Sequence, residues 1–247
     1  MQLVSQENGG YRFLSSRGAF PFSMGVVAVP GYEIVRARFR VPVPFKAGFD
    51  RIAEHLAGLN RPRTAFCAAE LRCARPYTAA EFGSPDGFNS HYVRLLSEWG
   101  IVLGDQAAAA RTNVAPENYP PSEQVVFAFC YTVKSDGAPV SFVVSGATEG
   151  NNVAPGDRSA VGLTAKTANV LRTLDSRMEA LGVRWTDATA ISVYAVNDMW
   201  PSLQTDLFAS RPAAAQLGVH WFATRPPIEG LDLELDVRGV RTEIVLD

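Results

Sequence analysis

Two neighbouring stretches decide the fold class: DRSAVGLTAKTANVLRTLDSRMEALG, residues 157–182, and ATAISVYAV, residues 188–196. In the first stretch apolar residues recur every three or four positions, which predicts the longest helix of the chain, and Gly182 stands where a helix-ending glycine is common. The second stretch is a short apolar run, which predicts a strand. A helix that leads directly into a strand is typical of a fold that mixes both elements.

Outward from this stretch, the two halves of the chain show the same order of predicted elements. The first half predicts a hairpin of residues 22–29 and 32–41 around Pro30-Gly31, then a helix at 46–59, a strand at 63–74, a helix at 86–99 and a weak strand at 105–114. The second half predicts strands at 124–133 and 140–145, the long helix, the strand at 188–196, a short helix at 201–210 and strands at 216–223 and 231–240. The repeated order indicates an internal duplication of an α+β unit.

The segment PENYPPSE, residues 116–123, has three prolines in eight residues and is the best candidate linker. It divides the chain into a first domain at 20–123 and a second domain at 124–247. Residues 1–19 are polar and rich in Gly, Ser and Arg, so we expect a loosely packed N-terminal extension.

The composition narrows the class of protein. The 247 residues carry 23 Lys and Arg against 25 Asp and Glu, a net charge of −2, which argues against nucleic acid as the main partner. The chain is 47% hydrophobic and 19% charged, as globular proteins are. No apolar run is long enough for a membrane span, the N-terminus does not resemble a signal peptide, and three cysteines suit a reducing compartment. We therefore expect a cytoplasmic protein without membrane contact.

The second half resembles the RidA (YjgF) family of small imine and enamine deaminases. The resemblance is carried by three segments. The first is Phe142-Val143-Val144-Ser145-Gly146, and the second is the passage from the long helix through Trp185-Thr186-Asp187 into the run Ile191-Ser192-Val193-Tyr194-Ala195-Val196-Asn197-Asp198-Met199. The third is a closing segment with Pro226-Pro227, Gly230 and Leu233-Glu234-Leu235-Asp236-Val237. The first half resembles the family more weakly, mainly through Ala110-Arg111-Thr112-Asn113-Val114 followed by Pro120.

The resemblance covers most of the chain and implies two chorismate-mutase-like α+β domains, each a mixed sheet backed by two helices. RidA proteins form trimers with a ligand cleft at each subunit interface, so it also implies a homo-oligomer, with a trimer favoured. Tandem relatives include the chorismatases, so the chemistry of this architecture is not uniform.

The resemblance implies that an Arg binds the substrate carboxylate and that a Glu orients the hydrolytic water. Arg111 matches the Arg in the first half, and Glu234 matches the Glu in the second half, but neither half retains both. One hypothesis is a composite site that combines Arg111 and Glu234, within or between chains. The alternative is that both sites have decayed and these residues are structural.

Each further candidate for substrate binding has a structural role as the alternative to a functional one. Ser145 and Gly146 offer a hydroxyl and an accessible backbone N–H to a ligand, or simply end a strand. His220 is a possible acid, base or carboxylate anchor near the missing second-half Arg, or a structural histidine. Tyr194 and Trp221 are candidates to wall a conjugated substrate, or belong to the core or an interface.

The sequence thus predicts a hydrolase of the imine/enamine deaminase type that acts on a small carboxylated metabolite without metal or organic cofactor. The first alternative is a chorismatase-like lyase or hydrolase acting on a cyclic carboxylic acid. The second is a non-catalytic small-molecule binder or assembly subunit whose sites have diverged.

Overall fold

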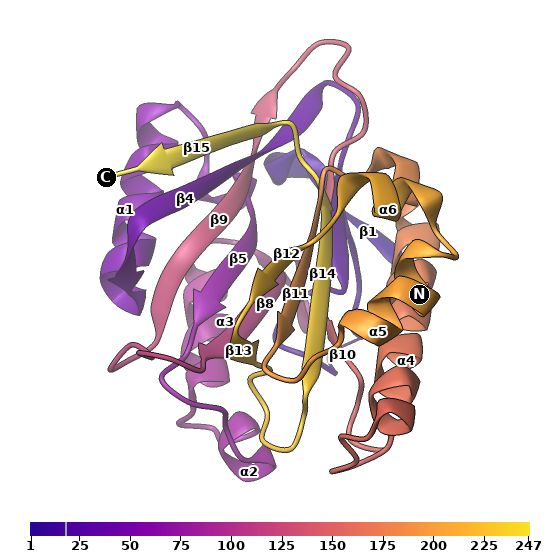
Figure 1. Ribbon diagram of the computed structural model, residues 1–247. Coiled ribbons are helices and arrows are strands. Elements are labelled where there is room, and N and C mark those ends of the chain that lie inside the picture. Colours follow the sequence, from indigo (N-terminus) through magenta and orange to yellow (C-terminus); the bar gives the residue numbers. More distant parts are fainter. Residues whose placement is uncertain (18) are drawn as a thin grey trace.

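Two mixed β-sheets lie face to face in the middle of the molecule, and helices cover their outer faces (Figure 1). This architecture is seen in a computed structural model that describes residues 1–17 and 19–247. Each sheet combines parallel and antiparallel pairs, and each has its own apolar core beneath its helices. The predicted α+β class, with mixed sheets backed by helices, is confirmed.

The first sheet has seven strands. In spatial order they are β1 (Leu3–Gln6), β2 (Tyr11–Leu14), β3 (Gly25–Ala28), β10 (Phe142–Thr148), β14 (Leu233–Gly239), β11 (Ala190–Ala195) and β12 (His220–Phe222). The register of β10 against β14 shifts between Val144 and Ala147, so that a bulge lies at Ser145 and Gly146. Bulges re-aim side chains and are frequent beside functional sites.

The second sheet has six strands. In spatial order they are β13 (Thr224–Arg225), β8 (Ala110–Pro116), β5 (Phe66–Arg72), β9 (Val125–Lys134), β4 (Tyr32–Pro44) and β15 (Thr242–Leu246). A separate small hairpin joins β6 (Val102–Leu103) to β7 (Gln106–Ala107). The C-terminal strand β15, which the sequence analysis did not predict, pairs in parallel with β4.

The helices close the outer layers. They are α1 (Phe45–Gly58), α2 (Ala79–Phe82), α3 (Phe88–Glu98), α4 (Ala160–Leu181), α5 (Trp200–Ser202) and α6 (Pro212–Leu217), with 3₁₀ turns at Glu7–Gly9, Arg63–Ala65 and Trp185–Asp187 and a π-helical turn at Leu203–Phe208. The Ser159 hydroxyl caps the start of α4, and Gly182 ends it with a φ of 75°, a left-handed conformation that glycine adopts readily. Helix α4 covers the seven-stranded sheet, whereas α1 and α3 pack into the core of the six-stranded sheet.

The predicted hairpin of residues 22–29 and 32–41 is wrong, because its two strands join different sheets. The chain does turn at Pro30-Gly31, where the Tyr32 N–H donates to the Val29 carbonyl at 3.0 Å. Yet β3 pairs with β2 and β10, while β4 pairs with β9 and β15. In the second half, likewise, β9 joins the six-stranded sheet and β10 the seven-stranded one. Each sheet is therefore built from strands that lie on both sides of residue 123. The division of the chain into domains at 123/124 stays a prediction.

The expectation of a loose N-terminal segment is also wrong, apart from Gly18, which lies outside the described residues. Tyr11, Phe13 and Leu14 are fully buried, and the Tyr11 hydroxyl donates to the Phe66 carbonyl. Three apolar side chains among polar neighbours are enough to anchor an edge hairpin, because β1 and β2 extend the sheet next to β3.

The layer between the two sheets is unusually polar. Along β14, Leu233, Leu235 and Val237 belong to the core under α4, so the alternating residues Glu234, Asp236 and Arg238 face the other sheet. These charged residues are nonetheless buried. A face that looks solvated in the sequence is thus covered by a second sheet.

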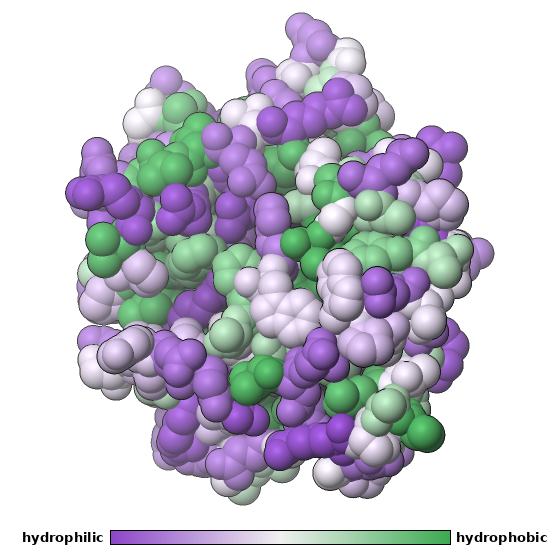
Figure 2. Space-filling model, in the orientation of Figure 1, coloured by the Kyte–Doolittle hydropathy of each residue, from purple (hydrophilic) through white to green (hydrophobic). Residues whose placement is uncertain are grey.

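On the outer surface, hydrophilic and apolar residues are intermixed over the face seen in Figure 2. Within residues 1–17 and 19–247, no helix is both long enough and apolar enough to cross a bilayer.

Candidate active site

A cavity of about 300 Å³ lies where both sheets and helix α4 meet. The six-stranded sheet contributes Arg111 and Asn113 from β8, and the seven-stranded sheet contributes Gly146 and Thr148 from β10 and Glu234 from β14. Helix α4 adds Asn169, Thr173 and Arg177, and apolar side chains come from Phe20, Phe22, Met24, Phe82, Pro227 and Ile228. The cavity is therefore a mostly apolar slot with a few charged groups, as is typical of small-molecule sites.

Arg111 is a buried cation held by aromatic rings. Only 3% of its surface is exposed, and its guanidinium carbon lies 4.5 Å from the ring centroid of Phe22 and 5.0 Å from that of Tyr92. Nη1 donates to the Asn89 side-chain oxygen at 2.9 Å. Burial lowers the pKa of Arg111 to about 10, so the arginine remains charged at neutral pH. Within the described chain it forms no ion pair, which leaves most of its five N–H donors for an anion.

Glu234 faces the same cavity from the other sheet. It is 3% exposed, and Oε2 is buried without a hydrogen-bond partner in the part of the chain that the structure describes. Burial, reinforced by the nearby Asp236 charge, raises the pKa of Glu234 to about 8, although Arg111 and Arg177 act in the opposite direction. The carboxyl is thus mainly protonated at neutral pH and is suited to donate a proton.

Gly146 and Ser145 occupy the bulge of β10 but do different things. Gly146 lines the cavity, and a Cβ atom at this position would collide with Oε1 of Glu234. The Ser145 hydroxyl is fully buried: it donates to the Ser23 carbonyl at 2.6 Å and accepts the Arg111 backbone N–H at 3.0 Å. Because its only proton is used within the chain, Ser145 positions Arg111, and Gly146 makes room for Glu234.

Arg177 is a cavity residue that the sequence analysis missed. It projects from α4, and its Nη1 donates to the carbonyls of Ser145 at 2.8 Å and Gly146 at 3.2 Å. Burial lowers its pKa to about 10, and it has no carboxylate partner within ion-pair distance among the residues described. Its position in the helix carries no signal, because only the packing of α4 on β10 brings it to the site.

A family model described as "2-aminomuconate deaminase CnbZ" matches residues 3–244. The chain belongs to this family. A curated relative, the 2-amino-5-chloromuconate deaminase of Comamonas testosteroni, is 36% identical over 249 residues, which cover 96% of each chain.

Solved structures are similar at lower identity. A chorismatase matches with a TM-score of 0.48 and 12% identity, over 97% of this chain and 80% of its own. The YjgF gene product of E. coli matches with a TM-score of 0.31 and 17% identity, over 43% of this chain and 84% of its own. Both kinds of protein, a chorismatase and a YjgF protein, are ones that the resemblance in the sequence also named.

Like Ser145, the other three predicted site residues are not among the described residues that line the cavity of this CnbZ-family chain. His220 and Trp221 lie on the edge strand β12, where His220 is exposed and Trp221 is 38% exposed. The Trp221 indole N–H donates to the Ala195 carbonyl at 3.1 Å. Tyr194 is fully buried in the polar layer, where its hydroxyl donates to Asp236. Any contact of these residues with a substrate stays a prediction.

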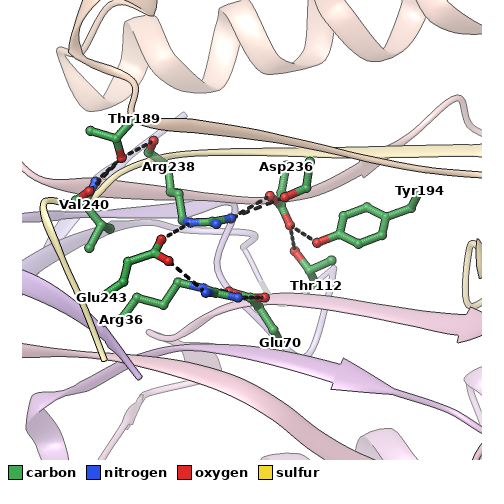
Figure 3. A network of polar contacts seen from close by, with 10 residues as sticks. Arg36, Glu70, Thr112, Thr189, Tyr194, Asp236, Arg238, Val240 and Glu243 are labelled. Carbon is green, nitrogen blue, oxygen red and sulfur yellow. Dashed lines mark hydrogen bonds and ion pairs between the residues drawn. The ribbon is translucent and has the colours of Figure 1, made fainter. Parts of the chain in front are cut away.

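The polar layer forms a network beside the site (Figure 3). Asp236 accepts hydrogen bonds from Thr112 at 2.9 Å and from Tyr194 at 2.8 Å. Arg36 donates two hydrogen bonds to the Glu70 carboxylate. Glu243 accepts hydrogen bonds from both Arg36 and Arg238. The network ties β14, β5, β4 and β15 together and fixes the strand that carries Glu234.

Among the described residues no group of three or more His, Cys, Asp and Glu side chains is arranged to hold a metal ion.

Proposed function

We propose that this chain is a hydrolytic deaminase of 2-aminomuconate-type enamines. One observation carries the proposal: Arg111 and Glu234, from different sheets and opposite halves of the sequence, line the same cavity. This shared lining supports the composite-site hypothesis in the form in which one chain supplies both residues. The family match and the relative that acts on a chlorinated aminomuconate support the same substrate class.

Arg111 binds the carboxylate next to the amino-bearing carbon, since a guanidinium pairs with a carboxylate through two parallel hydrogen bonds. The apolar side chains around it, such as Phe22, Met24 and Ile228, contact the conjugated carbon chain. This placement brings the enamine between the guanidinium and the carboxyl of Glu234.

The protonated Glu234 then donates its proton to the enamine carbon, which turns the C–N bond into an iminium bond. The resulting carboxylate orients a water molecule and accepts its proton as the oxygen adds to the iminium carbon. Collapse of the adduct breaks the C–N bond, so that one water is consumed, ammonia leaves and a carbonyl remains. All protons come from water and Glu234, and the reaction as proposed needs no cofactor.

The test is turnover of 2-aminomuconate generated in situ, followed by ammonia release. We expect the wild-type protein to be active and Arg111→Ala and Glu234→Gln each to lose at least about a hundredfold in kcat/KM. Arg12→Ala and Glu179→Gln, at exposed positions on β2 and α4, serve as matched controls and should keep full activity.

Full activity in both site variants would refute the composite site. A protein that accelerates neither this reaction nor the hydrolysis of imines generated by an amino-acid oxidase would instead favour a non-catalytic binder.

A further inference from the structure

Two arginines enter the cavity from different layers of the fold. Arg111 comes from β8 in the six-stranded sheet, and Arg177 comes from α4, which covers the seven-stranded sheet. The guanidinium of Arg177 uses Nη1 for the carbonyls of Ser145 and Gly146, and no described residue accepts from Nε or Nη2. Arg177 thus keeps donors available while its position is held by the backbone of the β10 bulge.

The charges of the cavity do not balance without a ligand. Neither Arg111 nor Arg177 has an acidic partner within 4.0 Å among the residues described. Glu234 is the acidic residue that lines the cavity, and its raised pKa keeps it largely neutral at pH 7. One buried cation, Arg111, and one half-buried cation, Arg177, face a neutral acid and leave the site with an excess of two positive charges, which a dianion would neutralise.

We propose that Arg177 binds the second carboxylate of a dicarboxylate substrate, while Arg111 binds the first. This inference rests on the proposed function and adds to it the residue that makes the site selective for dicarboxylates over monocarboxylates. Binding of the dianion also places negative charge near Glu234, which keeps this acid protonated for the chemical step.

Two unreactive probes test the assignment, because they share one diene chain and differ in a single carboxylate. Muconate is hexa-2,4-dienedioate, and sorbate is hexa-2,4-dienoate. We expect calorimetry on the wild-type protein to show muconate binding tighter than sorbate by about tenfold or more, as one charge-assisted contact allows. In Arg177→Met this ratio should fall to about one, with sorbate affinity changed by no more than about twofold.

Matched variants separate substrate binding from a structural role. Arg177→Lys retains the charge but not the fork of donors, so it should restore part of the ratio. Arg12→Ala should leave the ratio unchanged. If Arg177 only supports the β10 bulge, Arg177→Met should weaken both probes equally, and that result would overturn the proposal.

An unchanged ratio in Arg177→Met would also overturn it, as would a wild-type protein that binds both probes equally or neither. Muconate and sorbate carry no amino group, so their binding does not depend on deamination. Tighter binding of muconate than of sorbate, without turnover of the aminomuconate, would contradict the proposed function alone. Turnover together with equal binding of the two probes would contradict this inference alone.

Discussion

Glu234 and Asp236 are two residues apart on β14 and face the same polar layer, so their charges interact at short range. Asp236 is the second cause, after burial, of the raised pKa of Glu234. Burial also raises the pKa of Asp236. If the protonated form of Glu234 is the active one, kcat/KM should fall as the pH rises through about 8.

Asp236→Asn should shift this alkaline decline in kcat/KM, the alkaline limb of the pH profile, to lower pH. The substitution removes the negative charge that raises the pKa of Glu234, while an amide oxygen can still accept from Thr112 and Tyr194. The measurement is the pH profile of kcat/KM for both proteins. A limb that stays in place, or moves to higher pH, would exclude Glu234 as the group that titrates.

The same carboxyl should make stability depend on pH. Its pKa is 4.5 in the unfolded chain and about 8 in the folded one, so the folded state binds more protons between these values. The free energy of unfolding should therefore fall as the pH rises through this window, by an amount on the order of a few kcal/mol. Glu234→Gln lacks this contribution, so its stability relative to wild type should increase from pH 5 to about 8. Urea unfolding of both proteins at several pH values checks this prediction. A difference in the free energy of unfolding that stays the same at every pH would contradict it.

Gly146→Ala should reduce activity because of a steric clash and not because of backbone conformation. Gly146 has no positive φ, yet the added methyl group would collide with Oε1 of Glu234. We expect a loss of at least about tenfold in kcat/KM because the acid is displaced. Gly137→Ala is not a suitable control, since its φ is 72°, whereas Gly58→Ala at the end of α1 meets open space and should be neutral. An active Gly146→Ala enzyme would show that Glu234 can act from another position.

At the scale of elements, polar groups fill the layer between the sheets, where Glu243 on β15 accepts from Arg238 on β14 at 3.1 Å. Charged pairs in this layer also join strands of the six-stranded sheet to one another. Arg36 on β4 and Glu70 on β5 are bonded at 2.5 and 2.7 Å, and Arg36 also reaches Glu243 on β15 at 3.2 Å. The guanidinium of Arg36 lowers the pKa of Glu70 to about 2 against the effect of burial. Such a pair stabilises only while both members are present.

Glu70→Ala should therefore lower the free energy of unfolding by about 3–5 kcal/mol, because it leaves Arg36 buried without its main partner. The double variant Arg36→Met/Glu70→Leu should be closer to wild type than the single variant, because it buries no unpaired charge. Asp50→Ala breaks the exposed Lys46–Asp50 pair and should leave stability unresolved from wild type. Urea denaturation compares the four proteins, and a neutral Glu70→Ala would show that water reaches the layer.

At the scale of the whole molecule, the halves exchange strands. The seven-stranded sheet contains β1, β2 and β3 from the first half, and the six-stranded sheet contains β9, β13 and β15 from the second. Neither half of the sequence can complete a sheet alone. The predicted homotrimer is a separate matter and stays a prediction that light scattering of the purified protein would decide.

The fragment 124–247 should not fold as a well-behaved monomer, because it lacks β1–β3 and exposes β9 without β4 and β5. Expressed together, fragments 1–123 and 124–247 should associate and regain part of the activity. Size-exclusion chromatography and circular dichroism would follow both experiments. A fragment 124–247 that is monomeric and unfolds cooperatively by itself would contradict the exchange of strands between the two halves.

Local patterns of sequence were sufficient for most of the longer helices and strands, although they missed β1, β2 and β15. The spacing of apolar residues placed α4 and α1, and the alternation along β14 put Glu234 and Asp236 on one face. These properties depend on neighbours a few residues apart, so the sequence by itself determines them. The motif resemblance added the functional reading of Arg111 and Glu234.

Only the tertiary structure decided which sheet each strand joins and what shares the cavity. The turn at Pro30-Gly31 is local, but one of the two strands that pair with β3 lies more than a hundred residues away on β10. Arg177 enters the site because α4 packs on that strand. The Ser145 hydroxyl is used within the chain because it donates to the Ser23 carbonyl and accepts from the Arg111 backbone N–H, and both groups belong to segments far away in the sequence. Pairing energies between distant segments set these contacts, and no local pattern reports them.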